Sequence, residues 1–164
     1  MKRVLLAINH AYLFFGTTLY VGVLWALHFF WFPSWRGLTV ANYYEQFIPQ
    51  TTAATRFFTI VVPLMILAMV VMLWSEWKTR LRWVPIVALL CLGGATFFGT
   101  MRIIPVNRIL AGRVTDQARL TELLQRWMSL NDIRWVLLTI LWLTLMYYFL
   151  RKGDTWRALG SDRP

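Results

Sequence analysis

Residues 120–150 read LTELLQRWMSLNDIRWVLLTILWLTLMYYFL, and this stretch decides the fold. Its second part, 133–150, is almost wholly apolar and close to the length that crosses a bilayer as a helix. Its first part is amphipathic, because apolar residues recur at three- and four-residue spacings: Leu120, Leu123, Leu124, Trp127, Leu130 and Ile133. The pattern predicts one helix that begins near Thr115 or Asp116, is capped by one of them, and runs into a membrane span.

Three more apolar runs precede this one, at 4–32, 57–74 and 84–101. In a chain of 164 residues with 59% hydrophobic and 15% charged residues, they indicate a polytopic membrane protein. Backbone groups find no water inside a bilayer, so the spans must be helices. We predict an all-α fold, a membrane four-helix bundle formed by a single domain over 1–164. A long amphipathic helical hairpin is expected between spans three and four, and a short polar loop over 33–56.

The positive charges indicate the orientation of the bundle. The start, Met1-Lys2-Arg3, resembles a signal peptide, but the following apolar run is longer than such a signal needs, so we expect a retained first span. All lysines would lie on one side, which predicts an integral protein of a bacterial inner membrane with both termini in the cytoplasm. The arginines on the other side depart from this rule. Topology and anionic lipid account for the net charge of +10, so no nucleic-acid partner is predicted.

Small residues and one cysteine mark the third span. Cys91, Ala95 and Gly99 recur every four residues, a spacing that lets a neighbouring helix approach closely. We therefore predict a helix contact on this face. Cys91 is the only cysteine, so it has no partner within the chain for a disulfide.

The segment from Arg102 to Arg134 is the most unusual part of the chain, with six arginines and two asparagines beside apolar spans. Trp127, Asn131 and Arg134 are four and three residues apart, so they share one helix face. An aromatic ring, an amide and a fixed cation could clamp a planar oxygenated ring or a carboxylate. Alternatively, Trp127 anchors at the membrane surface, Arg134 extends to lipid headgroups, and the asparagines fasten the hairpin. We predict that Asn131 and Arg134 face the bundle interior, within reach of Asn107 or Arg102, because polar groups facing lipid are costly.

The two histidines, His10 and His28, are five helical turns apart on one span, so they cannot bind one metal ion. Either could be an axial haem ligand if a second subunit or another residue supplied the other ligand. No metal or cofactor is predicted, and haem remains an alternative. His28 lies at the polar end of the bundle. It is expected to project toward the polar cluster as a general base, or to be a hydrogen-bonded structural residue.

Short motifs in the second half of the chain resemble a known family. Ile104-Pro105-Val106-Asn107 leaves span three, and Trp127-x-x-x-Asn131-x-x-Arg134 enters span four. Together they resemble the anthrone-oxygenase-like family of small four-helix membrane proteins, a functionally mixed group. The family pattern has Pro-Leu-Asn where this chain has Pro105-Val106-Asn107, and Phe32-Pro33 is similar to its Met-Pro.

This resemblance implies cofactor-independent oxygenation of a planar phenolic or polycyclic substrate. Under this interpretation His28 is the base, Arg102 or Arg134 stabilises the oxyanion, and the substrate is bound by Asn107, Trp127 and Asn131. His28 and Arg102 do not belong to the family motif, so their roles rest on chemistry alone. The alternative is a non-enzymatic accessory or scaffold subunit of a larger membrane complex, or a haem- or pigment-binding protein. Its partners would be the bilayer, a small aromatic ligand, and another membrane protein or a second copy of the chain.

Overall fold

The computed structural model describes the backbone over residues 2–161 and the side chains over 4–153. All regular structure in this part is helical, which confirms the predicted all-α four-helix fold. The elements are α1 (Lys2–Ala26), the π-turn η1 (Leu27–Trp31), α2 (Phe32–Trp35), α3 (Tyr43–Glu76), α4 (Trp83–Phe98), the π-turn η2 (Gly99–Ile103), α5 (Ile104–Ala111) and α6 (Gln117–Ser161).

Four helical stretches are long and apolar enough to cross a membrane, so the chain is an integral membrane protein in contact with lipid. They cover Val4–Trp35, Tyr43–Glu76, Trp83–Ala111 and Gln117–Gly153. The second begins well before the predicted residue 57, so the prediction of a loop over 33–56 is wrong from Tyr43 onward. The threonines of this segment are compatible with a helix because their hydroxyls form hydrogen bonds to the helix backbone. Thr51 and Thr55 each donate a hydrogen bond to the carbonyl four residues earlier, at 2.9 and 2.7 Å.

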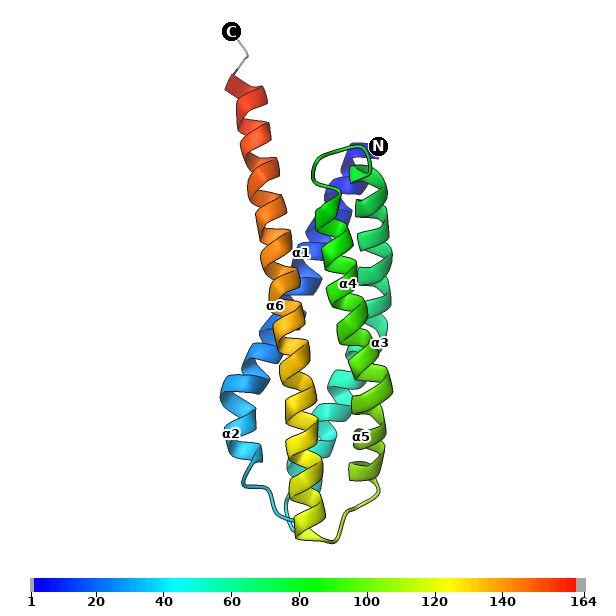
Figure 1. Cartoon of the computed structure of the whole chain (residues 1–164), viewed down its shortest axis with the longest axis vertical. Coiled ribbons are helices and arrows are strands. Elements are labelled where there is room, and N and C mark those ends of the chain that lie inside the picture. Colours follow the sequence, from blue (N-terminus) through cyan, green and yellow to red (C-terminus); the bar gives the residue numbers. More distant parts are fainter. Residues whose placement is uncertain (1, 162–164) are drawn as a thin grey trace.

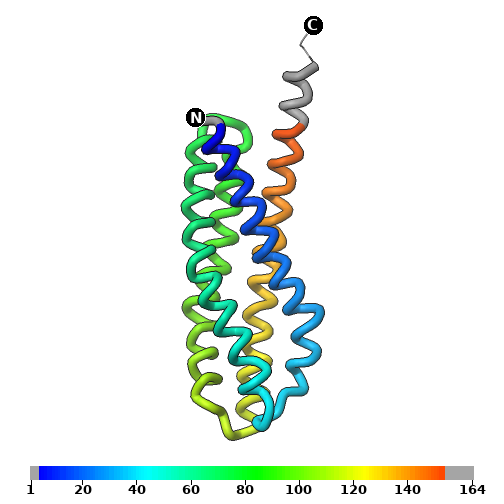
Figure 2. Tube along the Cα trace, turned by 180° about the vertical axis from the view of Figure 1, so that it is seen from behind, coloured from blue at the N-terminus to red at the C-terminus, as the bar shows by residue number. Residues whose placement is uncertain are grey.

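The four spans form an antiparallel bundle (Figure 1). α1 packs against α3 and α6, and α4 packs against the same two helices, so α3 and α6 stand at opposite corners. The start of α1 and the end of α6 lie at the same end of the molecule. At the other end, α1 diverges from α3 toward α2, as the view from behind shows (Figure 2). The connections before α3 and before α6 close this second end, which we call the loop end.

The contact between α4 and α6 confirms the predicted small-residue face. Cys91 and Ala95 of α4 are buried, and α4 and α6 pack closely together. A methyl group added to Gly99 would lie 3.8 Å from Cζ of Arg134 on α6, and one added to the neighbouring Gly94 would lie only 3.3 Å from Cδ1 of Leu137 on the same helix. Small side chains therefore let these two backbones approach each other.

The start of α6 also agrees with the sequence pattern. Asp116 Oδ1 accepts a hydrogen bond from the backbone N–H of Ala118 at 3.1 Å, so Asp116 is the predicted cap. The preceding connection is fastened by Tyr43, whose hydroxyl donates to the Leu110 carbonyl at 3.1 Å and accepts from the Val114 N–H at 2.6 Å. The amphipathic hairpin formed by α5 and the first turns of α6 is thereby fixed to α3.

Two π-turns interrupt the first and third spans at matching heights. In each, a backbone N–H reaches five residues back: Phe32 bonds to the Leu27 carbonyl, and Ile104 to the Gly99 carbonyl. Each turn is followed directly by a proline near the start of the next helix. A proline ring clashes with the carbonyl four residues before it, and the wider π-turn removes this clash without ending the helix.

The buried residues form two clusters along the bundle axis. The cluster toward the chain termini includes Leu13, Met65, Met69, Leu92 and Leu145. The cluster at the loop end includes Phe47, Leu110, Leu120, Leu123 and Trp127. Members of both clusters line a cavity beside the π-turns. The core is therefore divided into two parts at the level of the π-turns.

Candidate functional site

A cavity of about 610 Å³ lies beside the two π-turns, and all four spans contribute to its wall. This volume is typical of sites that bind small molecules. Most of the wall is apolar and aromatic. The polar residues in it are Tyr20, Gln50, Thr51, Thr55, Thr59, Thr96, Thr100, Asn107, Trp127, Asn131 and Arg134.

The predicted stripe on α6 lies in this wall. Asn131 is only 2% exposed, and its amide joins the other two members of the stripe. Its Nδ2 donates to the Trp127 carbonyl at 3.0 Å, and its Oδ1 accepts from Nη1 of Arg134 at 2.8 Å. The prediction that Asn131 and Arg134 face the bundle interior is therefore confirmed. Because all of these groups stand on one helix, their relative positions are rigid.

Asn107 joins α5 to this stripe. Its Oδ1 accepts a hydrogen bond from Nε1 of Trp127 at 2.8 Å. Trp127 is 4% exposed and meets the rings of Phe32, Trp35 and Phe47 edge-on. Trp127 thus packs inside the bundle and does not anchor at the membrane surface. The expected fastening of the hairpin by Asn107 is present, and the same bond orients the indole that forms part of the cavity wall.

Among the described residues that line the cavity, Arg134 is the only cation, and its environment is unusual. Nη1 donates to Asn131, and Nη2 donates to the hydroxyl of Tyr20 on α1. Its Nε is buried and has no hydrogen-bond acceptor among the described residues. None of the ion pairs in the described part of the chain includes Arg134. A partly buried guanidinium without a carboxylate partner is costly, so the site is electrostatically suited to an oxyanion or a carbonyl oxygen.

Tyr20 is a site residue that the sequence analysis missed. Its ring stacks on Phe58 of α3 with a centroid distance of 4.2 Å, and the Arg134 guanidinium lies 5.6 Å from the centre of the same ring. Its position in an apolar span gives no spacing signal, because its partners stand on other helices. An isolated tyrosine that falls deep within a predicted span was the available clue, since its hydroxyl requires a partner there.

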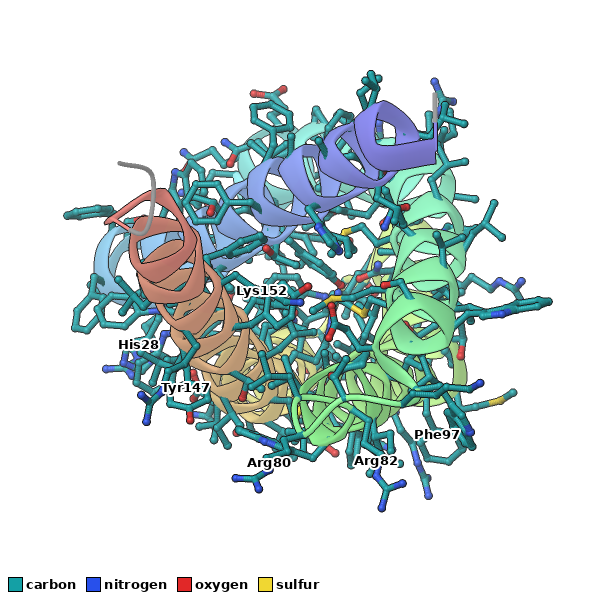
Figure 3. All side chains as sticks on the ribbon, turned by 90° about the horizontal axis from the view of Figure 1, so that it is seen from above. His28, Arg80, Arg82, Phe97, Tyr147 and Lys152 are labelled. Atoms are coloured by element: carbon teal, nitrogen blue, oxygen red, sulfur yellow. The ribbon has the colours of Figure 1, made fainter. Side chains whose placement is uncertain are left out.

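His28 does not line the cavity, so the prediction that it projects into it is wrong. Its Nδ1 lies 2.8 Å from Oδ1 of Asp132, and its ring stacks on Trp135 at a centroid distance of 4.5 Å. Figure 3 shows His28 at the periphery of the bundle. The preceding residue, Leu27, lies in the cavity wall, and one helical step turns the imidazole away from it. His28 instead joins η1 to α6 on the outer side.

We therefore expect His28→Ala to lower stability and to leave the cavity unchanged. The imidazole and the Asp132 carboxylate are 32% and 44% exposed, so their coupling should be only about 0.5–1 kcal/mol. A double-mutant cycle of His28→Ala and Asp132→Ala, followed by unfolding in detergent, measures this coupling. Loss of ligand binding in a stable His28→Ala protein would contradict this assignment.

Arg102 is also absent from the cavity wall. It belongs to η2, where the next residue, Ile103, is buried in the wall and the Arg102 side chain is exposed. Of the two arginines considered for an oxyanion role, the structure brings only Arg134 to the cavity. Asn107, Trp127, Asn131 and Arg134 thus stand together, and His28 and Arg102 stand outside them.

Neither histidine offers a ligand to the cavity. His10 lies on α1 in the half of the bundle that contains the termini, with its ring edge-on to Tyr148 at 5.5 Å. Within the part of the chain that the structure describes, no group of three or more His, Cys, Asp or Glu residues could hold a metal ion. The described wall of the cavity contains no histidine that could bind haem iron.

A second polar cluster, also missed in the sequence, lies toward the termini around the buried Glu76 of α3. Its Oε1 accepts hydrogen bonds from the Tyr148 hydroxyl at 2.8 Å and from Nζ of Lys152 at 2.9 Å, and its Oε2 accepts from Thr79 at 2.6 Å. Figure 3 shows Lys152 over the bundle interior, whereas Arg80 and Arg82 lie at its edge. The cluster connects α3 to α6 across the bundle.

Comparison of the chain with protein-family models, with curated proteins and with solved structures finds no match.

Proposed function

We propose that the cavity binds a planar phenolic or polycyclic aromatic molecule and that Arg134 holds one of its oxygen atoms. The observation that carries this proposal is the Arg134 guanidinium, which lies in the wall of a largely apolar cavity and forms no ion pair with a carboxylate of the described residues. A carbonyl or phenolate oxygen in the cavity would give this cation a polar partner. The rings of Trp31, Trp35 and Trp127 in the wall favour a flat aromatic partner, because stacked and edge-on ring contacts add to the gain from burial.

The resemblance to anthrone-oxygenase-like proteins adds a reaction to this proposal. A base removes a proton from an activated methylene group, and Arg134 stabilises the enolate oxygen. The carbanion adds dioxygen, the resulting peroxide anion takes up a proton, and loss of water converts the methylene to a carbonyl. One oxygen atom of dioxygen becomes the carbonyl oxygen and the other leaves as water, and the substrate supplies all the electrons, so no metal or organic cofactor is required.

Tyr20 replaces His28 as the proposed base in this scheme. It is the other titratable residue in the described wall, and its oxygen already accepts a hydrogen bond from Arg134. Asn107, Asn131 and Trp127 keep the roles of positioning the substrate and forming the wall.

The direct test is titration of the purified protein in lipid nanodiscs with anthraquinone, followed by quenching of tryptophan fluorescence. We expect saturable quenching in the wild type. Ala54→Phe, which places a ring in the cavity wall, should abolish it, and Ala7→Phe on the exposed surface of α1 should not. Quenching that does not saturate, or that is equal in all three proteins, would refute the binding site.

Oxygen consumption with anthrone tests the reaction separately. We expect consumption above that of protein-free nanodiscs, and loss of this excess in Ala54→Phe. If anthraquinone binds but oxygen uptake equals the protein-free rate, the cavity is a binding site and the oxygenase reaction is wrong.

We further propose that both termini face the cytoplasm of a bacterial inner membrane. All lysines lie in the terminal segments or in the connection between α3 and α4, and these segments gather at one end of the bundle (Figure 1). Positively charged residues favour the cytoplasmic side. The cavity would then lie in the outer half of the bundle.

A further inference from the structure

Five threonines form a second polar feature of the cavity that the proposed function does not use. Thr51, Thr55 and Thr59 follow one another at four-residue spacing on α3, and Thr96 and Thr100 do so on α4 and η2. We call these five residues the hydroxyl ladder. α3 packs against α4, so the two rows belong to neighbouring helices of one wall.

The hydrogen-bonding state of the ladder limits what it can bind. Each hydroxyl donates its proton to the backbone carbonyl four residues earlier, at distances between 2.7 and 3.0 Å. A hydroxyl has one proton and two acceptor lone pairs, so a donor already engaged leaves the oxygen only as an acceptor. The ladder therefore offers acceptors to the cavity.

Arg134 has the opposite character, because a guanidinium has donors and no acceptor. The cavity thus presents a donor on α6 and acceptors on α3 and on α4 and η2, in a wall that is otherwise largely apolar and aromatic. A ligand that satisfies both needs an oxygen acceptor and, elsewhere on the same flat frame, a hydroxyl that donates. A hydroxyl buried without a partner would weaken binding, so the ladder makes it possible for a hydroxylated molecule to enter an apolar cavity.

We propose that the hydroxyl ladder is a second subsite that accepts hydrogen bonds from phenolic hydroxyls of the ligand, so that the cavity selects hydroxylated polycyclic ketones over unsubstituted ones. This inference rests on the proposed function, because it specifies the substrate class of the same cavity. Arg134 binds the carbonyl oxygen of the ligand, and the hydroxyl ladder accepts hydrogen bonds from its hydroxyl groups.

Two probes separate the subsites. Anthraquinone carries acceptors only, whereas 2,6-dihydroxyanthraquinone carries the same carbonyls and two donors. Binding is measured in nanodiscs at mildly acidic pH, where the hydroxyls remain protonated. The affinity of each variant is divided by that of the wild type for the same probe, because this ratio cancels the different partitioning of the two probes into lipid.

The test variant is the double substitution Thr55→Val and Thr96→Val, which replaces one hydroxyl on each helix by a methyl group of similar size. We expect affinity for the dihydroxy probe to fall about tenfold, as when a site built to bond a hydroxyl loses that bond, and affinity for anthraquinone to stay within about twofold. Thr144→Val is the matched control, because its hydroxyl donates to the Ile140 carbonyl at 2.7 Å in the same way but Thr144 does not line the cavity.

The outcomes are distinguishable. Equal weakening of both probes, or no weakening of either in the double variant, overturns the hydroxyl ladder as a subsite and leaves the Arg134 site intact. If neither probe binds the wild type saturably, the proposed function fails and the ladder inference fails with it. Weakening of the dihydroxy probe in Thr144→Val as strong as in the double variant would also overturn the inference.

Discussion

Replacing Arg134 by methionine is expected to weaken binding of anthraquinone about 30- to 150-fold, which corresponds to the loss of about 2–3 kcal/mol from a hydrogen bond to a charged group. The reason is that Arg134 is the only cation in the described cavity wall and that it has no carboxylate partner among the described residues. Methionine keeps most of the apolar volume of the side chain, so the shape of the cavity should change little. Titration in nanodiscs measures the effect.

The stability of this variant distinguishes a binding residue from a structural one. Arg134→Met removes the bonds to Asn131 and Tyr20 but also removes a partly buried cation without a carboxylate partner, so these effects should largely offset each other. Arg134→Lys retains the charge but lacks the planar fork that reaches both neighbours, and should recover only part of the affinity. Unaltered anthraquinone affinity in folded Arg134→Met would rule out the assigned role.

Replacing Glu76 by alanine is expected to destabilise the bundle by about 1–3 kcal/mol, the effect of leaving a buried hydrogen-bond donor without its acceptor. Glu76 is only 4% exposed, and its loss leaves the Lys152 ammonium and the buried Tyr148 hydroxyl without their acceptor. These groups connect α3 to α6, two helices that stand at opposite corners. Unfolding by titration with a denaturing detergent measures the change.

Two further variants identify the source of this loss. Glu76→Gln keeps a hydrogen-bond acceptor without the charge, so it should cost less than alanine. Glu45→Ala, at the exposed first turn of the same helix, is the matched control and should stay within about 0.5 kcal/mol of the wild type. If Glu76→Ala were no less stable than Glu45→Ala, the cluster would contribute nothing to the bundle.

The features that the sequence predicted correctly depend on local geometry. The four spans follow from the length of apolar runs, and the shared face of Trp127, Asn131 and Arg134 follows from the pitch of one helix. The start of α3 was predicted too late because threonines and glutamines resemble a polar loop. Inside a bundle, however, a threonine satisfies its own hydroxyl on the helix backbone.

The features that were missed depend on which helices become neighbours. Tyr20 meets Arg134, and Glu76 meets Lys152, across sequence distances for which no spacing rule exists. His28 was misplaced for a related reason. Its position along the bundle axis could be predicted from the sequence. The direction in which its side chain points around the helix, however, depends on the π-turn and on packing against Trp135.

The two π-turns determine how a deletion in the chain would affect the cavity wall. Each contains one residue more than an α-helical turn, so it shifts the phase of every following side chain by about 100°. Asn107 reaches Trp127 with this shift in place. If one residue of η2 were lost, Arg108 would occupy the position of Asn107 and bring a second cation toward the cavity. Which side chains line the cavity therefore depends on the number of residues in each π-turn as well as on the types of the lining residues. A single deletion upstream would alter more of the wall than any one substitution within it.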